Sequence, residues 1–245
     1  MVRLSTIIFS LFIFLVSFQA QAKNPPPGTG TSDIPANILI MLDNSGSMSA
    51  KLYNSVQVYY PLDVATDSSG NIYVMEYYNN RIKVFDSSGA YLRSFGGYGS
   101  GCTRWQYARQ FAIHNDEIYI ADTYGHRLKV LNLTGGCINE TTLAYSYPHA
   151  IAVTNQYVYV GNNTSRIWIH ARGSIHSMNN YNAGSNLSYS WGMSIDSGGS
   201  RLLIADYVKN RLVEFIATGS SFSGGGQAML RYGNAGNTRD RKSVV

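Results

Sequence analysis

Charged residues are scarce in this chain of 245 residues, of which they make up 13%. The formal net charge is +5, and subtracting Arg3 and the net +1 of residues 240–245 leaves +3. No run of lysine or arginine interleaved with aromatic residues occurs before residue 240. A small positive surplus without such a run makes nucleic acid an unexpected partner.

Long apolar runs are absent beyond the N-terminus. Residues 4–18 are almost all apolar, follow Arg3 and precede Ala20-Gln21-Ala22. An apolar run of about 15 residues is shorter than the roughly 20 that span a bilayer, and a basic start with small residues at the end is typical of a signal peptide. We expect residues 1–22 to be cleaved rather than kept as an anchor. The mature protein should have no transmembrane segment and be secreted, periplasmic or on the cell surface.

Cysteine is limited to Cys102 and Cys137. An even number in an exported chain permits one disulfide, provided that the two α-carbons come within about 7 Å. The spacing alone leaves this open. Two cysteines without close paired ligands do not suggest a zinc site.

Composition divides the rest of the chain into four parts. Residues 23–35 are a linker rich in proline and glycine, residues 36–55 hold a short strand and a loop, and residues 56–223 hold repeats. Residues 224–245 form a tail whose last six residues resemble a translated sequencing adapter, which suggests that the natural chain continues. A short polar tail that frays is the alternative.

A unit of about 40 to 47 residues recurs four times between residues 56 and 223. Each unit opens with a tyrosine, continues with a second strand that ends at an acid or amide, and resumes at an arginine that leads a third strand. The openings are Tyr60, Tyr107, Tyr147 and Tyr189, the acids and amide are Glu76, Asp122, Asn162 and Asp206, and the arginines are Arg81, Arg127, Arg166 and Arg211. A fourth strand is visible mainly at residues 91–95. Short strands with polar turns and no helical period predict an all-β fold, a β-propeller rather than a solenoid.

The second repeat contains Tyr119-Ile120-Ala121-Asp122-Thr123-Tyr124-Gly125-His126-Arg127-Leu128-Lys129-Val130, which resembles the central motif of the NHL repeat family. The resemblance weakens in the third repeat, where the turn before Arg166 is one residue shorter, and in the first, where Glu76 replaces the usual aspartate. It implies an NHL-type propeller that serves as an interaction platform. Such propellers usually close with about six blades, so four visible repeats imply an incomplete ring.

The acid and the arginine of each unit flank a short turn. Since they recur in every repeat, we expect them to form a bond within each blade that holds the turn, and not a catalytic centre.

Asp43, Ser45 and Ser47 follow an apolar strand and offer three oxygen ligands for a hard cation. The motif resembles the start of a von Willebrand factor A domain with its metal-ion-dependent adhesion site, as in pilus-tip adhesins of the PilY type. The resemblance implies a divalent cation, magnesium, as cofactor and a protein or cell-surface ligand. The repeats begin within about ten residues of Ser47. Either the propeller is inserted into an adhesion domain, or the motif is a stray strand and turn.

The expected function is an exported, non-enzymatic binding, adhesion or surface-assembly protein, with no catalytic and no cofactor-binding residue. The alternative is an exported NHL-type propeller enzyme, a metal-dependent lyase or hydrolase. Its metal would need histidines, but these occupy different offsets within the repeats. They are His114, His126, His149, His170 and His176. His149 is the best candidate because it lies in an inner-strand opening.

Overall fold

The computed structural model describes residues 51–52, 56–145 and 147–231. The chain divides into two compact units, Met1–Ile38 and Leu39–Val245, and all the described residues belong to the second. Among the described residues no helix is both long and apolar enough to cross a membrane. The expected signal peptide, the linker and the loop of Asp43, Ser45 and Ser47 lie outside the described residues.

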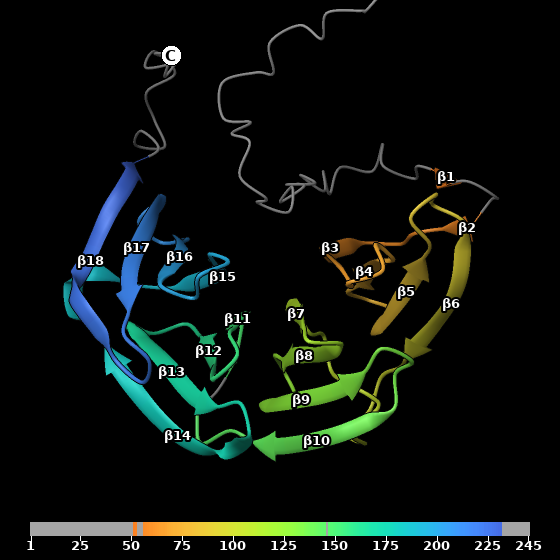
Figure 1. Cartoon of the computed structure of the whole chain (residues 1–245), viewed down its shortest axis with the longest axis horizontal. Helices are drawn as coiled ribbons and strands as arrows, with labels where there is room; N and C mark the ends of the chain where they lie inside the picture. Colours follow the sequence, from red (N-terminus) through yellow and green to blue (C-terminus); the bar gives the residue numbers. More distant parts are fainter. Residues whose placement is uncertain (1–50, 53–55, 146, 232–245) are drawn as a thin grey trace, which may run out of the picture. The chain divides into compact units, whose positions relative to one another are not determined.

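Four antiparallel four-stranded sheets follow one another along the described chain, and each is one repeat (Figure 1). The first is β3 (Pro61–Thr66), β4 (Ile72–Glu76), β5 (Arg81–Phe85) and β6 (Tyr91–Gly96), and the second is β7 (Gln110–His114), β8 (Glu117–Asp122), β9 (Arg127–Asn132) and β10 (Cys137–Thr142). The third is β11 (Ala150–Val153), β12 (Tyr157–Gly161), β13 (Arg166–Ala171) and β14 (Ser174–Asn182), and the fourth is β15 (Ser190–Ile195), β16 (Arg201–Asp206), β17 (Arg211–Ala217) and β18 (Phe222–Arg231). The described residues also include the paired short strands β1 (Lys51–Leu52) and β2 (Val56–Gln57) and a 3-10 helix, η1 (Gly184–Asn186).

These sheets are propeller blades, as the repeats predict. The first strands of the blades, β3, β7, β11 and β15, lie innermost and follow one another, while β6, β10, β14 and β18 lie outermost (Figure 1). Strands β10, β14 and β18 supply the fourth strand that the sequence hardly reveals. Strand β18 extends eight residues past the boundary expected at residue 223.

The side chains of each second strand point alternately to the two faces of its sheet, which explains why the blades stack. In β12, Val158 and Val160 join an apolar cluster with the second blade, whereas Tyr159 between them joins a cluster with the fourth. In β8, Ile118 and Ile120 face the first blade and Tyr119 faces the third. Side chains of a strand point alternately to the two faces, so each sheet needs a neighbour on both sides. Burying each such side chain contributes about 1.5–3 kcal/mol.

Candidate functional site

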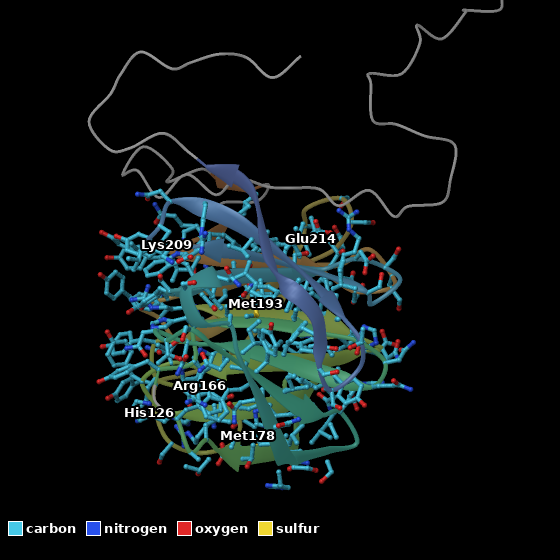
Figure 2. All side chains as sticks on the ribbon, turned by 90° about the vertical axis from the view of Figure 1, so that its left-hand side faces the viewer. His126, Arg166, Met178, Met193, Lys209 and Glu214 are labelled. Atoms are coloured by element: carbon cyan, nitrogen blue, oxygen red, sulfur yellow. A yellow bond between two sulfur atoms is a disulfide. The ribbon has the colours of Figure 1, made fainter. Side chains whose placement is uncertain are left out.

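One end of the blades collects the aromatic side chains. Because consecutive strands are antiparallel, the residue before each inner strand and the turn after each second strand lie at the same end. Tyrosines occupy both places in most blades. We call this set the tyrosine face; it comprises Tyr59, Tyr60, Tyr77, Tyr78, Tyr98, Tyr107, Tyr124, Tyr147, Tyr189, Trp191 and Tyr207. In Figure 2, His126, which touches Tyr147, and Lys209 lie on the side of the blades that carries this face.

The rings touch one another in two arcs. The first runs through the first three blades, with edge-to-face contacts such as Tyr60 with Tyr78 at 4.7 Å and Tyr124 with Tyr147 at 5.5 Å between ring centroids. The second joins Tyr189, Trp191 and Tyr207 in the fourth blade to His149 in the third. Most of these rings keep a large exposed fraction, up to 60% at Tyr207. Such a gathering of exposed aromatic side chains is typical of a recognition surface.

Arg109 bridges the two arcs. Its guanidinium carbon lies 5.5 Å from the ring centroid of Tyr77 in the first blade and 4.5 Å from that of Trp191 in the fourth. Its buried Nε has no hydrogen-bond partner, and its guanidinium forms no ion pair with any described residue. Arg109 is therefore a half-buried cation that only ring faces hold.

The residues at the centre of the face occupy one position of the repeat. Counting the opening tyrosine as the first residue, the third residue of the four openings is Leu62, Arg109, His149 and Trp191. The fifth residue is apolar in every blade. The third residue, in contrast, is apolar, cationic or aromatic depending on the blade. Equivalent positions that differ within a repeat are where a site can be built without disturbing the scaffold. This comparison is the sequence signal that could have found Arg109 and Trp191.

His149 is the one histidine that lies within this centre. It is 4% exposed, its Nε2 lies 2.7 Å from the hydroxyl of Tyr189, and its Nδ1 has no hydrogen-bond partner among the described residues. Burial, together with the positive charge of Arg109, lowers the pKa of His149 to about 4. The imidazole is therefore neutral near pH 7, so Arg109 is the charged group at this centre.

A surface hollow of about 340 Å³ opens beside Trp191 at the fourth blade. It is lined by Trp191, Ala205, Asp206, Tyr207, Asn210, Arg211 and Leu212. This volume is at the small end of the range for sites that bind small organic molecules.

Three tyrosines of the face have a strained backbone conformation. Tyr60, Tyr107 and Tyr147 have φ angles of 47°, 51° and 53°, in the left-handed region that costs a residue with a side chain roughly 1 kcal/mol or more. Hydrogen bonds hold this backbone: the amide of Tyr107 donates to Asn80 Oδ1 at 2.5 Å, and the amide of Tyr147 donates to His126 Nδ1 at 3.1 Å. Tyr107 and Tyr147 are thus held in place by the turns around them.

Side chains on the inner strands tie the blades together beneath the face. Asp63 Oδ2 accepts a hydrogen bond from the amide of Phe111 at 2.9 Å, and Gln110 Oε1 accepts from the amides of Ile151 and Met193 at 2.8 and 3.1 Å. Figure 2 shows Met193 in the middle of the blades. Asp63 keeps some accessible surface, but protein atoms surround it and no cation of the described residues forms an ion pair with it. This burial raises the pKa of Asp63 to about 7, although the amides of Phe111 and Val64 act to lower it.

In the first, second and fourth blades the acid and the arginine form the expected bond within one blade. Arg81 pairs with Glu76, Arg127 Nη2 lies 2.8 Å from Asp122 Oδ2, and Arg211 Nε lies 3.1 Å from Asp206 Oδ2. The acids also accept backbone amides of the preceding loops, as Asp122 does from Gln106 at 2.7 Å. These pairs close the turns, as their recurrence predicts.

The third blade departs from this pattern, as its shorter turn suggests. Arg166 Nη1 donates to Asn180 Oδ1 at 2.7 Å, and Asn162 Oδ1 accepts from the amide and the hydroxyl of Thr164 at 3.2 and 2.6 Å. The turn carries no aromatic side chain, so this blade contributes Tyr147 to the tyrosine face and His149 to its centre.

The other histidines are dispersed. His114 contacts Asn155, His126 contacts Tyr147, His170 is buried against Tyr145 and Ile175, and His176 contacts Thr141. No group of three histidine, cysteine, aspartate or glutamate side chains among the described residues could hold a metal ion.

Cys102 and Cys137 form a disulfide with α-carbons 5.7 Å apart. The bond ties the loop that enters the second blade to the outer strand β10 of that blade. The question that the sequence leaves open is thereby answered.

Comparison with known proteins agrees with this architecture. The model of a family described as DUF5128, 6-bladed beta-propeller, matches residues 60–187. A streptogramin B lyase structure is 17% identical and matches with a TM-score of 0.54, covering 66% of this chain and 53% of that one. Virginiamycin B lyase from Staphylococcus aureus is 14% identical, with a TM-score of 0.54, and covers 66% and 54%. A catalytically inactive variant of that lyase with quinupristin is 16% identical, with a TM-score of 0.53 and the same coverage. No curated protein matches the chain.

These structures share the fold, and the chain spans about half of their length. They also correct one expectation. The sequence led us to expect a protein that is not an enzyme, whereas these three solved structures with the same fold are of lyases. The expectation was wrong because it relied on the lack of a local catalytic motif. A propeller can assemble a site from single residues on several blades, which leaves no such motif.

Proposed function

This chain belongs to the 6-bladed beta-propeller family DUF5128, and we propose that it uses the blades as a rigid scaffold and binds its ligand at the tyrosine face. Binding is the step that adhesion and catalysis share, and the proposal concerns that step.

The position of Arg109 is the observation that carries the proposal. Arg109 is a cation without an acidic partner among the described residues, and it lies between rings of the first and fourth blades. The blades are already held by apolar clusters and by the acid–arginine pairs. The positive charge of Arg109 among these rings would be stabilised further by a ligand that supplies the missing partner.

The finer proposals rest on the sequence. They are an NHL-type propeller exported for adhesion or surface assembly, with a protein or cell-surface ligand and a magnesium site at Asp43, Ser45 and Ser47. The disulfide between Cys102 and Cys137 supports an oxidising compartment, since such bonds persist outside the cytosol.

Replacing Trp191 or Tyr207 by alanine is expected to weaken the binding of small ring compounds about tenfold, because each contact between aromatic rings contributes about 0.5–1.5 kcal/mol beyond the area it buries. Saturation-transfer NMR with phenol, phenylacetamide and phenylacetate measures this binding. Tyr91→Ala is the matched control, because Tyr91 is also exposed but begins β6 at the opposite end of its blade. Equal signals from all three variants and the parent protein would reject the tyrosine face as the binding surface.

A further inference from the structure

The arginines at the end of the blades that carries the tyrosine face differ in what neutralises them. Arg81, Arg127 and Arg211 each pair with an acid of their own blade. Arg109 lies against Tyr77 and Trp191 and has neither an ion pair nor a hydrogen bond with any described residue. Nε is buried, so the N–H groups of the two terminal nitrogens are the ones available to an acceptor that comes from outside.

The charge at this centre is that of a single cation. His149, the other basic group there, is buried and neutral, and Lys209 at the edge of the face donates a hydrogen bond from Nζ to the carbonyl oxygen of Ser185. A planar guanidinium matches the geometry of a carboxylate, which carries one negative charge and accepts two parallel hydrogen bonds. A doubly charged phosphate would leave one charge without a partner.

The surroundings of Arg109 suit a ring. Trp191 touches Arg109 and stacks on Tyr207, with ring centroids 4.8 Å apart, and both line the hollow of about 340 Å³. A ring that enters the hollow lies against Trp191, and the guanidinium carbon of Arg109 lies 4.5 Å from the ring centroid of Trp191.

We propose that the tyrosine face binds a ligand with a carboxylate attached to an aromatic ring by a short link, the carboxylate on Arg109 and the ring against Trp191 and Tyr207. This inference rests on the proposed function and adds the chemical class of the ligand. A free aromatic acid and the C-terminal aromatic residue of a peptide share this chemistry.

Calorimetric titration of the full chain with phenylacetate and with phenylacetamide tests the proposal, because the two differ mainly in charge. We expect phenylacetate to bind about 10- to 100-fold more tightly than phenylacetamide, since a hydrogen bond to a charged group is worth that factor. Arg109→Gln should abolish the difference and leave the binding of phenylacetamide within about threefold. Arg109→Lys keeps the charge and should keep part of the preference.

Lys209→Gln is the matched control, because it removes a positive charge from the same end without touching the rings at Arg109, and it should keep the full preference. Circular dichroism melting of each variant verifies that it folds. Equal affinities for both compounds in the parent protein, or a preference that survives Arg109→Gln, would overturn the inference and leave the binding face standing. If neither compound binds, both this inference and the proposed binding face are overturned.

A peptide ending in phenylalanine that binds more tightly than phenylacetate, and loses this advantage on C-terminal amidation, assigns the peptide source. The reverse order assigns the free acid, and either result supports the proposal.

Discussion

Replacing Asp122 by alanine is expected to lower the free energy of unfolding by about 3–5 kcal/mol, the range for breaking a buried ion pair. Asp122 is fully buried and lies 2.8 Å from Arg127 Nη2 and 3.9 Å from Nζ of the fully buried Lys129. It also accepts the amide of Gln106 at 2.7 Å. The truncation would leave Arg127 without its acid and this amide without its acceptor, while Lys129 would keep Glu140.

Urea unfolding at pH 7 measures the loss. Arg201→Ala provides the control, because it removes an ion pair with Glu214 at the surface. The side chain of Arg201 is 54% exposed. Pairs at the surface contribute at most about 1 kcal/mol, so this control should change the midpoint little. An Asp122→Ala protein as stable as the control would show that the acid–arginine pairs do not hold the turns.

The charge of Asp63 is expected to destabilise the blades as the pH rises. The unfolded chain ionises this carboxyl near pH 4, whereas in the folded protein its pKa is about 7. The folded state therefore holds a proton that the unfolded state releases. The contribution of Asp63 to the free energy of unfolding is fully present below pH 4 and is lost as the pH rises through 7, by about 1.4 kcal/mol per pH unit between pH 5 and 7.

Asp63→Asn removes the titration and keeps a side-chain oxygen that can accept the amide of Phe111. The test is the difference between the unfolding free energies of the parent protein and the variant at pH 5 and at pH 8. This difference isolates Asp63, because His149 and His170, whose pKa values burial lowers, titrate alike in both proteins. The free energy of unfolding of the variant, relative to that of the parent, should rise by about 2.5 kcal/mol from pH 5 to pH 8. Parallel pH profiles would show that the folded protein ionises Asp63 normally.

The blades could be predicted from the sequence because their determinants are local. The alternation of Ile118, Tyr119 and Ile120 already implies a sheet covered on both faces, and the structure places these side chains in two different apolar clusters. The spacing of Asp122 and Arg127 likewise implies a closed turn, because the two residues are only five positions apart. The outer strand β14 was hidden because it is mostly exposed and polar, so it lacks the apolar pattern that marks a strand.

The tyrosine face could be predicted only in part. The tyrosine at each opening is visible, but Arg109, His149 and Trp191 lie about 40 residues apart in the sequence, and only the convergence of the inner strands brings them together. Their shared position in the repeat is a signal that becomes useful once the blades are known to converge. The disulfide is a similar case, since the loop that carries Cys102 reaches β10 only in the folded blade.

The most direct test of the central claim is a hydrogen–deuterium exchange map of the full chain with and without saturating phenylacetate. Binding at the tyrosine face should slow exchange in the segments that begin the inner strands, residues 107–111, 147–151 and 189–193. The hairpins at the opposite end, residues 67–71 and 196–200, should exchange unchanged. Slowed exchange confined to those hairpins would place binding at the other end of the blades and contradict the account.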